Sequence, residues 1–209
     1  MRQSASTISR IFHPMFLPLL AFIITALATR TYVIYSNHQL LLITSAIILI
    51  TIGLPVLVIV FLKWIGLVTH IELNNRSERI LPLIICSIFV WGCSELLYKI
   101  HYPISLVIFF RLAVILILIA TFVTLFWKIS LHGLGWGTLT SIAFIVAGLN
   151  GGSLFFIFPL TIFISGIVTS ARLYMGAHTP TQIYTGYVLG IVGMLVGVVF
   201  QSSLMNFLL

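Results

Sequence analysis

The chain has 209 residues, of which 61% are hydrophobic and only 6% are Asp, Glu, Lys or Arg. Soluble domains carry about 25% charged residues, so this composition excludes an ordinary soluble domain and indicates a membrane protein. The formal net charge of +7 comes from ten basic residues scattered along the whole chain, a distribution that argues against nucleic-acid binding. With three glutamates and no aspartate, the chain can hardly build a carboxylate cage for Mg²⁺ or Ca²⁺, so we expect no metal and no cofactor.

Long apolar runs predict an all-α fold, a polytopic transmembrane helical bundle of six or seven helices. Each crossing needs about 20 apolar residues, and the alternating pattern of an outer-membrane barrel is missing from the sequence. We expect one integral membrane domain over 1–209, in which two N-terminal helices precede a core of about 70–206. Polar residues, glycines and prolines divide the chain into predicted crossings at 11–34, 40–66, 80–99, 103–128, 132–149, 153–172 and 181–206.

Three polar bridges between these crossings are predicted to emerge on one membrane face. They lie near 67–80, 128–132 and 172–180, and two crossings separate each from the next. Their sequences, HIELNNRSER, KISLHG and ARLYMGAHTPTQ, are the main polar stretches of the chain. The bridges on the opposite face have the composition of ordinary connections. A functional site is therefore expected where the three bridges meet.

The third bridge predicts a break between two helices. Arg172 and His178 would lie on different faces of one continuous helix, so we expect a helix to end between them, at Gly176. The next helix is predicted to begin with Thr179 as its N-cap, with Gln182 three residues later completing a capping box. His178 then precedes a helix N-terminus, where free N–H groups and the macrodipole favour an anion.

Together the three bridges resemble the signature of the type-2 phosphatidic acid phosphatase superfamily, the helical phosphatases related to vanadium haloperoxidases. Its third motif has Ser-Arg, five residues, His, three residues and Asp. Arg172 and His178 stand at this spacing, with Gln182 where the family has Asp. In the second motif, Pro-Ser-Gly-His, Ser130 and His132 stand at the serine and histidine. The resemblance runs from about residue 70 to about residue 190.

The first motif, Lys, six residues and Arg-Pro, fits this sequence least well. Arg79 can occupy the arginine position, but the proline stands at Pro82 and the lysine position is held by Glu72. Arg76 or Lys128 could supply the missing cation. The resemblance leaves this choice open.

The resemblance implies a metal-independent lipid-phosphate phosphatase that hydrolyses a phosphomonoester or pyrophosphate on a lipid. His178 would be the nucleophile that forms a phosphohistidine, and His132 the general acid. Gln182 would orient the His178 ring as Asp does in the family, without its negative charge. The phosphate-binding side chains would be Arg79, Arg172 and Ser130, with Arg76 or Lys128. The resemblance places such an enzyme in a bacterial inner membrane with its site on the periplasmic side, among membrane lipids.

Two other functions remain open on the sequence. A degenerate member could bind a phosphorylated lipid, or scaffold membrane partners, without catalysis, which the missing Asp and Lys favour. A transporter or channel is less well supported because the deep charges are Glu95 and Arg111, which we expect to form a structural ion pair. Cys86 and Cys93, seven residues apart, are predicted to be packing residues beyond disulfide reach.

Overall fold

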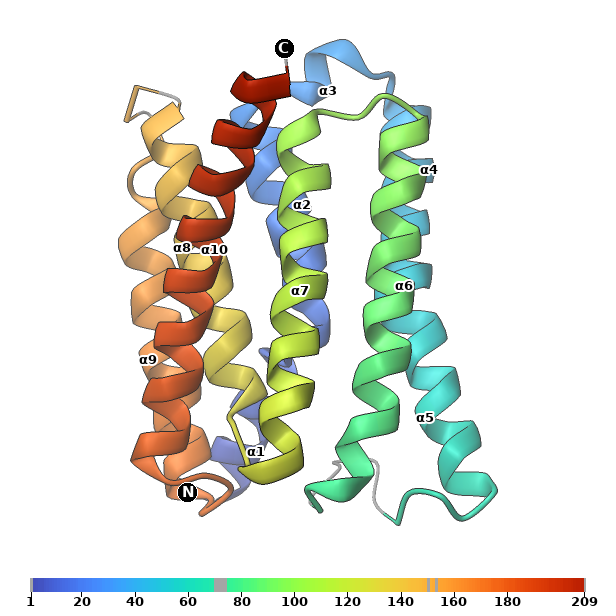
Figure 1. Ribbon diagram of the computed structural model, residues 1–209, viewed down its shortest axis with the longest axis vertical. Coiled ribbons are helices and arrows are strands. Elements are labelled where there is room, and N and C mark those ends of the chain that lie inside the picture. Colours follow the sequence, from blue (N-terminus) through green and yellow to red (C-terminus); the bar gives the residue numbers. More distant parts are fainter. Residues whose placement is uncertain (1, 70–74, 150, 153, 209) are drawn as a thin grey trace. The chain divides into compact units, whose positions relative to one another are not determined.

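A computed structural model describes residues 2–69, 75–149, 151–152 and 154–208, with only the backbone described for 202–208. Every regular element in these ranges is helical (Figure 1). Seven helical segments of the described chain are long and apolar enough to cross a membrane, which confirms the predicted all-α bundle of membrane-spanning helices. These segments are Arg2–Ala28, Asn37–Trp64, Ser77–Lys99, Ile104–Phe126, Leu131–Leu149, Ile157–Tyr174 and Pro180–Gln201.

The chain forms two compact units, residues 1–17 with 130–209 (unit 1) and residues 18–129 (unit 2). Unit 1 contains α1 (Arg2–Ile11), η1 (Pro14–Phe16), α8 (Leu131–Leu149), α9 (Ile157–Tyr174) and α10 (Pro180–Leu208). Unit 2 contains nearly all of α2 (Leu17–Ala28), and α3 (Thr31–Ile34), α4 (Asn37–Ile48), η2 (Leu49–Gly53), α5 (Leu54–Trp64), η3 (Ser77–Arg79), α6 (Ile80–Lys99) and α7 (Ile104–Phe126). The N-terminal residues thus pack with the C-terminal helices, a grouping that the expected core of about 70–206 did not include.

The helix predicted over 11–34 is wrong at both ends. The predicted start, residue 11, is instead the last residue of α1, and a break follows it. The backbone of His13 is extended there, because the following Pro14 disfavours a helical conformation in the residue before it. The His13 ring accepts a hydrogen bond from the Met15 amide and caps the short turn that follows. At the other end, Arg30 adopts a left-handed conformation (φ 50°) and separates α2 from α3. The first crossing therefore consists of α1, a break and α2.

In unit 2, the expected ion pair between Glu95 and Arg111 is confirmed. Arg111 Nη2 donates to Glu95 Oε1 at 2.8 Å, which links the adjacent helices α6 and α7. The guanidinium also lies over the Tyr98 ring, 5.2 Å from its centroid. An arginine at membrane depth is costly unless it is paired, and both contacts offset that cost.

In unit 1, α8 lies against both α9 and α10, and its contact with α10 is very close (Figure 1). A Cβ atom added to Gly137 would lie 2.1 Å from the Tyr187 carbonyl oxygen, and one added to Gly190 would lie 2.2 Å from the Leu134 carbonyl oxygen. Both positions therefore require glycine if the backbones are to approach this closely, as in other membrane helix pairs. Within α10, Gly190 is therefore a point of close helix packing.

Candidate functional site

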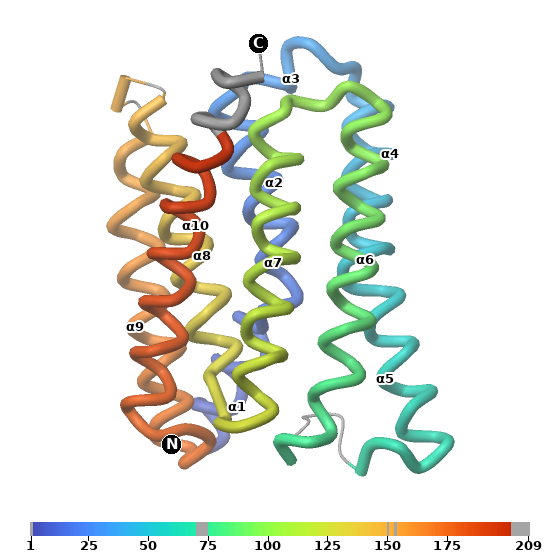
Figure 2. Tube along the Cα trace, viewed as in Figure 1, coloured from blue at the N-terminus to red at the C-terminus, as the bar shows by residue number. Residues whose placement is uncertain are grey.

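The turn between α9 and α10 follows the local geometry expected from the sequence. Gly176 has φ 67°, and its amide donates to the Leu173 carbonyl, while the Ala177 amide donates to the Arg172 carbonyl. This pair of bonds is a Schellman motif, which ends a helix with glycine in the left-handed region. Figure 2 shows the turn at the same end of unit 1 as the start of α8. The predicted break at Gly176 is confirmed.

His178 is tied to the beginning of α10 through Gln182. Nδ1 of His178 lies 3.0 Å from Gln182 Oε1, and the same oxygen accepts the Thr179 amide at 3.3 Å. In return, the Gln182 amide donates to Thr179 Oγ1 at 3.4 Å, so the predicted capping box is present. Gln182 therefore both completes the capping box of α10 and bonds the His178 ring.

These contacts determine which nitrogen of His178 carries the proton. The Thr179 amide can only donate, so the atom of Gln182 that faces it is the carbonyl oxygen rather than the nitrogen. That oxygen can only accept, and Nδ1 of His178 must therefore donate to it. A neutral His178 ring then carries its lone pair on Nε2. This is the tautomer that a nucleophilic imidazole requires.

The second polar bridge is hydrogen-bonded directly to the third. The Ser130 amide donates to the Gln182 carbonyl at 3.2 Å, and Gly186 leaves room for the Ser130 carbonyl, 2.5 Å from where a Cβ would stand. The Ser130 side chain is fully buried, and its hydroxyl accepts the Gly133 amide at 3.2 Å as the N-cap of α8. This hydroxyl thus already has a structural partner, in addition to the predicted role in phosphate binding.

His132 and Arg172 meet at a residue that the sequence did not single out, Ser9 of α1. Arg172 Nη1 donates to Ser9 Oγ at 3.1 Å, and Nε2 of His132 lies 3.3 Å from the same oxygen. Nε2 also lies 3.2 Å from the Ser9 backbone oxygen, which can only accept, so Nε2 carries a proton. Ser9 therefore joins a predicted catalytic histidine to a predicted phosphate-binding arginine.

A second histidine lies beside His132. The rings of His13 and His132 pack edge to face with their centroids 5.2 Å apart. Arg172, His13 and His178 all act electrostatically on the His132 ring, while His132 itself is only 6% exposed. The structure thus gathers three imidazoles and one guanidinium at one end of unit 1.

The sequence did not mark Ser9 or His13 as site residues, because Ser9 precedes the predicted first crossing of 11–34 and His13 lies near its start. The signal was present in the break that His13-Pro14 imposes, and in the polar character of SASTIS just before it. A helix that contains two arginines and several hydroxyl side chains is a poor lipid-facing span, and it buries Ala5 and Ser9 against the rest of unit 1. The polar side chains of α1 therefore indicated a helix that packs against the protein, and Ser9 of this helix belongs to the cluster.

The remaining predicted phosphate ligands, Arg76, Arg79 and Lys128, belong to unit 2. Arg76 donates through Nη1 to the Phe126 carbonyl, at the end of α7. Arg79 is buried and leads into α6 as its N-cap residue, and Lys128 follows α7. Glu72, at the position where the family has lysine, lies outside the described residues. The predicted roles of these cations stay predictions.

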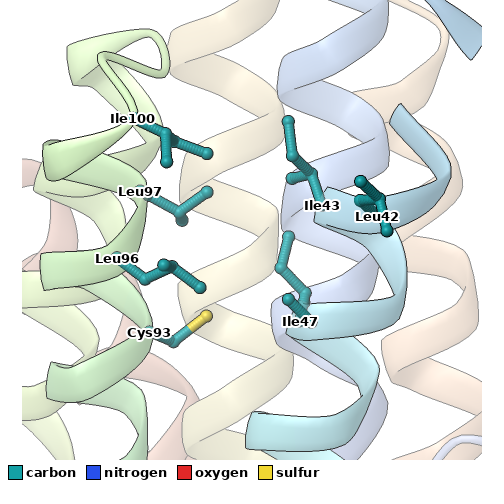
Figure 3. Close-up of a pocket in the computed structure, with 8 residues that line it drawn as sticks. Leu42, Ile43, Ile47, Cys93, Leu96, Leu97 and Ile100 are labelled. Atoms are coloured by element: carbon teal, nitrogen blue, oxygen red, sulfur yellow. The ribbon is translucent and has the colours of Figure 1, made fainter. Parts of the chain in front are cut away.

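A pocket in unit 2 differs sharply in chemistry from this cluster. It has a volume of about 200 Å³ and lies between α4 and α6 (Figure 3). Its walls are aliphatic apart from Cys93, whose sulfur points toward Ile47 in Figure 3. With no charged side chain in its lining, this pocket offers nothing to hold a phosphate. In the described part of the chain, no three His, Cys, Asp or Glu side chains gather as metal ligands would.

Comparisons of the chain with protein-family models, with curated proteins and with solved structures found no match.

Proposed function

We propose that the protein is a membrane lipid-phosphate phosphatase that works through a phosphohistidine at His178. The observation that carries this proposal is the contact between His178 Nδ1 and Gln182 Oε1, because it directs the lone pair of a neutral ring to Nε2. The neighbouring cluster of Arg172, Ser9 and His132 lies on the same unit and offers a cation and a second imidazole. Such a set is what phosphoryl transfer without a metal requires.

In the proposed reaction, Nε2 of His178 attacks the phosphorus atom of a lipid phosphomonoester or pyrophosphate. The N–P bond forms as the bond to the leaving oxygen breaks, and His132, protonated on both ring nitrogens at this step, gives that oxygen the proton on Nδ1 while Nε2–H stays bonded to Ser9. Water then attacks the phosphohistidine and releases inorganic phosphate, while His132 takes back a proton. Arg172 neutralises charge on the phosphoryl oxygens, for which a guanidinium fork is well shaped.

The second candidate is a protein that binds a phosphorylated lipid without hydrolysing it. Gln182 favours this candidate, since an amide oxygen cannot stabilise the positive charge that develops on His178 as a carboxylate does. The cluster of Arg172, Ser9 and His132 would then bind the anionic headgroup. Measured release of phosphate distinguishes the two functions, because only the phosphatase releases it.

The test is phosphate release by the purified protein in detergent, with a panel of lipid monophosphates and lipid pyrophosphates, without added metal. We expect release by the wild type, and a loss of at least about 100-fold in both His178→Ala and His132→Ala, the order expected for removal of a nucleophile or a general acid. Ser9→Ala should lower the rate about tenfold, because it removes an acceptor for Arg172.

Two variants serve as controls. His38→Ala removes an exposed histidine of α4 in unit 2, and Thr7→Ala removes from α1 a hydroxyl that bonds only the Gln3 carbonyl. Both should retain wild-type release. Release that survives loss of both His178 and His132 contradicts the mechanism, and binding of lipid phosphate without release from any substrate favours the second candidate.

A further inference from the structure

Unit 1 contains a groove between α1 and α9 that the proposed chemistry does not use. Its volume is about 720 Å³. On α1 it is lined by Ser4, Ala5 and Ile8, and on α9 by Ile162, Phe163, Gly166, Ile167, Ser170, Ala171 and Tyr174. The walls are mainly apolar, and several of these side chains, Phe163 among them, are well exposed along the groove. The lining belongs wholly to unit 1.

The groove adjoins the charged cluster through the two helices that form it. Ile8 directly precedes Ser9, and Ala171 directly precedes Arg172. The hydrogen bond from Arg172 Nη1 to Ser9 Oγ therefore joins the two walls next to their lining residues. A ligand in the groove would have an apolar part against α9 and could place an anionic end beside the guanidinium.

The dimensions match one leaflet of a bilayer. The lining of α9 extends from Ile162 to Tyr174, which is about 18 Å at a rise of about 1.5 Å per residue. One leaflet of a hydrocarbon core of about 30 Å measures about 15 Å. The α9 wall is a segment long and apolar enough to span a membrane, and the α1 wall is the first part of another such segment, Arg2–Ala28. We therefore expect lipid along the open side of the groove. An acyl chain is the apolar ligand that this length and this setting select.

Gly166 keeps the middle of the groove open. A Cβ added there would meet no atom within 4 Å, although Gly166 lies inside a regular helix where most residues are more favourable than glycine. A larger side chain at this position would therefore occupy the groove without disturbing the packing of the protein.

We propose that the groove between α1 and α9 binds an acyl chain of the lipid phosphate whose headgroup is held at Arg172. This inference rests on the proposed function for the identity of the headgroup, and it makes the substrate a long-chain lipid rather than a soluble phosphate ester. The groove would select among substrates by chain length, because each buried methylene adds to binding.

The first test compares Gly166→Leu with Gly148→Leu, in which the same substitution is made at another helical glycine with no atom within 4 Å of its Cβ position. For a phosphatidic acid with palmitoyl chains, we expect kcat/KM to fall at least about tenfold in Gly166→Leu, the effect of losing about two methylene contacts. For the hexanoyl analogue it should stay within about twofold of the wild type, and Gly148→Leu should change neither.

The second test does not depend on turnover. A palmitoyl phosphatidic acid with a diazirine near the end of one chain is photolysed with the protein, and the labelled peptides are identified by mass spectrometry. We expect labels in α1 and α9 that unlabelled phosphatidic acid removes and phosphatidylcholine does not. These labels should be lost in Gly166→Leu and retained in Gly148→Leu.

The two readouts distinguish failure of the groove from failure of the enzyme. Labels in α1 and α9 without phosphate release would support the groove and contradict the phosphatase. Labels confined to other helices, or insensitive to Gly166→Leu, would overturn the groove whatever the rate of phosphate release.

Discussion

Gln182 accepts two hydrogen bonds through one oxygen, from the Thr179 amide and from the His178 ring. The first bond begins a helix, and the second fixes a tautomer. Capping α10 does not by itself require a contact with His178, and orienting His178 does not by itself require a bond to the Thr179 amide. Gln182 does both. The double contact therefore lets one glutamine both begin α10 and hold the His178 ring in a single tautomer.

At this scale, we expect Gln182→Ala to lower phosphate release about tenfold to a hundredfold, since it removes the acceptor that orients His178. Gln182→Glu has the same length and adds a negative charge, so it should keep or raise the rate. Gln39→Ala is the matched control because Gln39 forms the same capping box with Ser36, and its side-chain oxygen accepts from Ser36 rather than from a histidine ring. It should lower thermal stability in detergent and leave release unchanged. Equal losses of release in the two alanine variants would contradict an orienting role for Gln182.

Among the helices, the glycine contacts between α8 and α10 set the distance between the second and third polar bridges. Gly186 faces the Ser130 carbonyl, and Gly133 faces the Ile183 carbonyl, 2.6 Å from where its Cβ would stand. The hydrogen bond from Ser130 to Gln182 lies at the end of this contact. The close approach of two helices is therefore what brings His132 and His178 to the same end of unit 1.

Gly190→Ala tests this element. The added methyl would overlap the Leu134 carbonyl, so we expect an overpacking cost of about 2 kcal/mol and a melting temperature lower by about 4–8 °C in detergent. Gly148→Ala, where no atom lies within 4 Å, should leave the melting temperature unchanged or raise it, because alanine favours helix by up to about 1 kcal/mol. A Gly190→Ala protein as stable as the wild type would mean that the two helices are not held together at this point.

For the molecule as a whole, the order of crossings decides which ends of the helices share a membrane face. Because α9 is long and apolar enough to span a membrane, we expect its two ends on opposite faces. The turn after α9 carries His178, and the turn before it carries glycines with positive φ at 151 and 152 and no charged residue among its described positions. The site is therefore expected on one face, which we propose is the periplasmic one.

Single cysteines report this arrangement in intact bacterial cells. A membrane-impermeant maleimide should label Ala177→Cys from outside and should label Phe155→Cys only after permeabilisation. The wild type, with Cys86 and Cys93 inside α6, provides the background. Labelling of both variants from the same side contradicts a crossing by α9, and the reverse pattern places the site in the cytoplasm.

The sequence by itself determined the membrane class, the seven spans, the pair of Glu95 and Arg111, and the local turn from Arg172 to Gln182. All of these depend on composition or on interactions between residues near in sequence or in adjacent helices, and such interactions leave a pattern in one chain. Only the tertiary structure decided that Ser9 and His13 lie beside His132, that the Ser130 amide bonds the Gln182 carbonyl, and that α1 and α9 form a groove. More than one hundred residues separate α1 from α8 along the chain, so their contact depends on how the helices pack and on no local rule that the sequence displays.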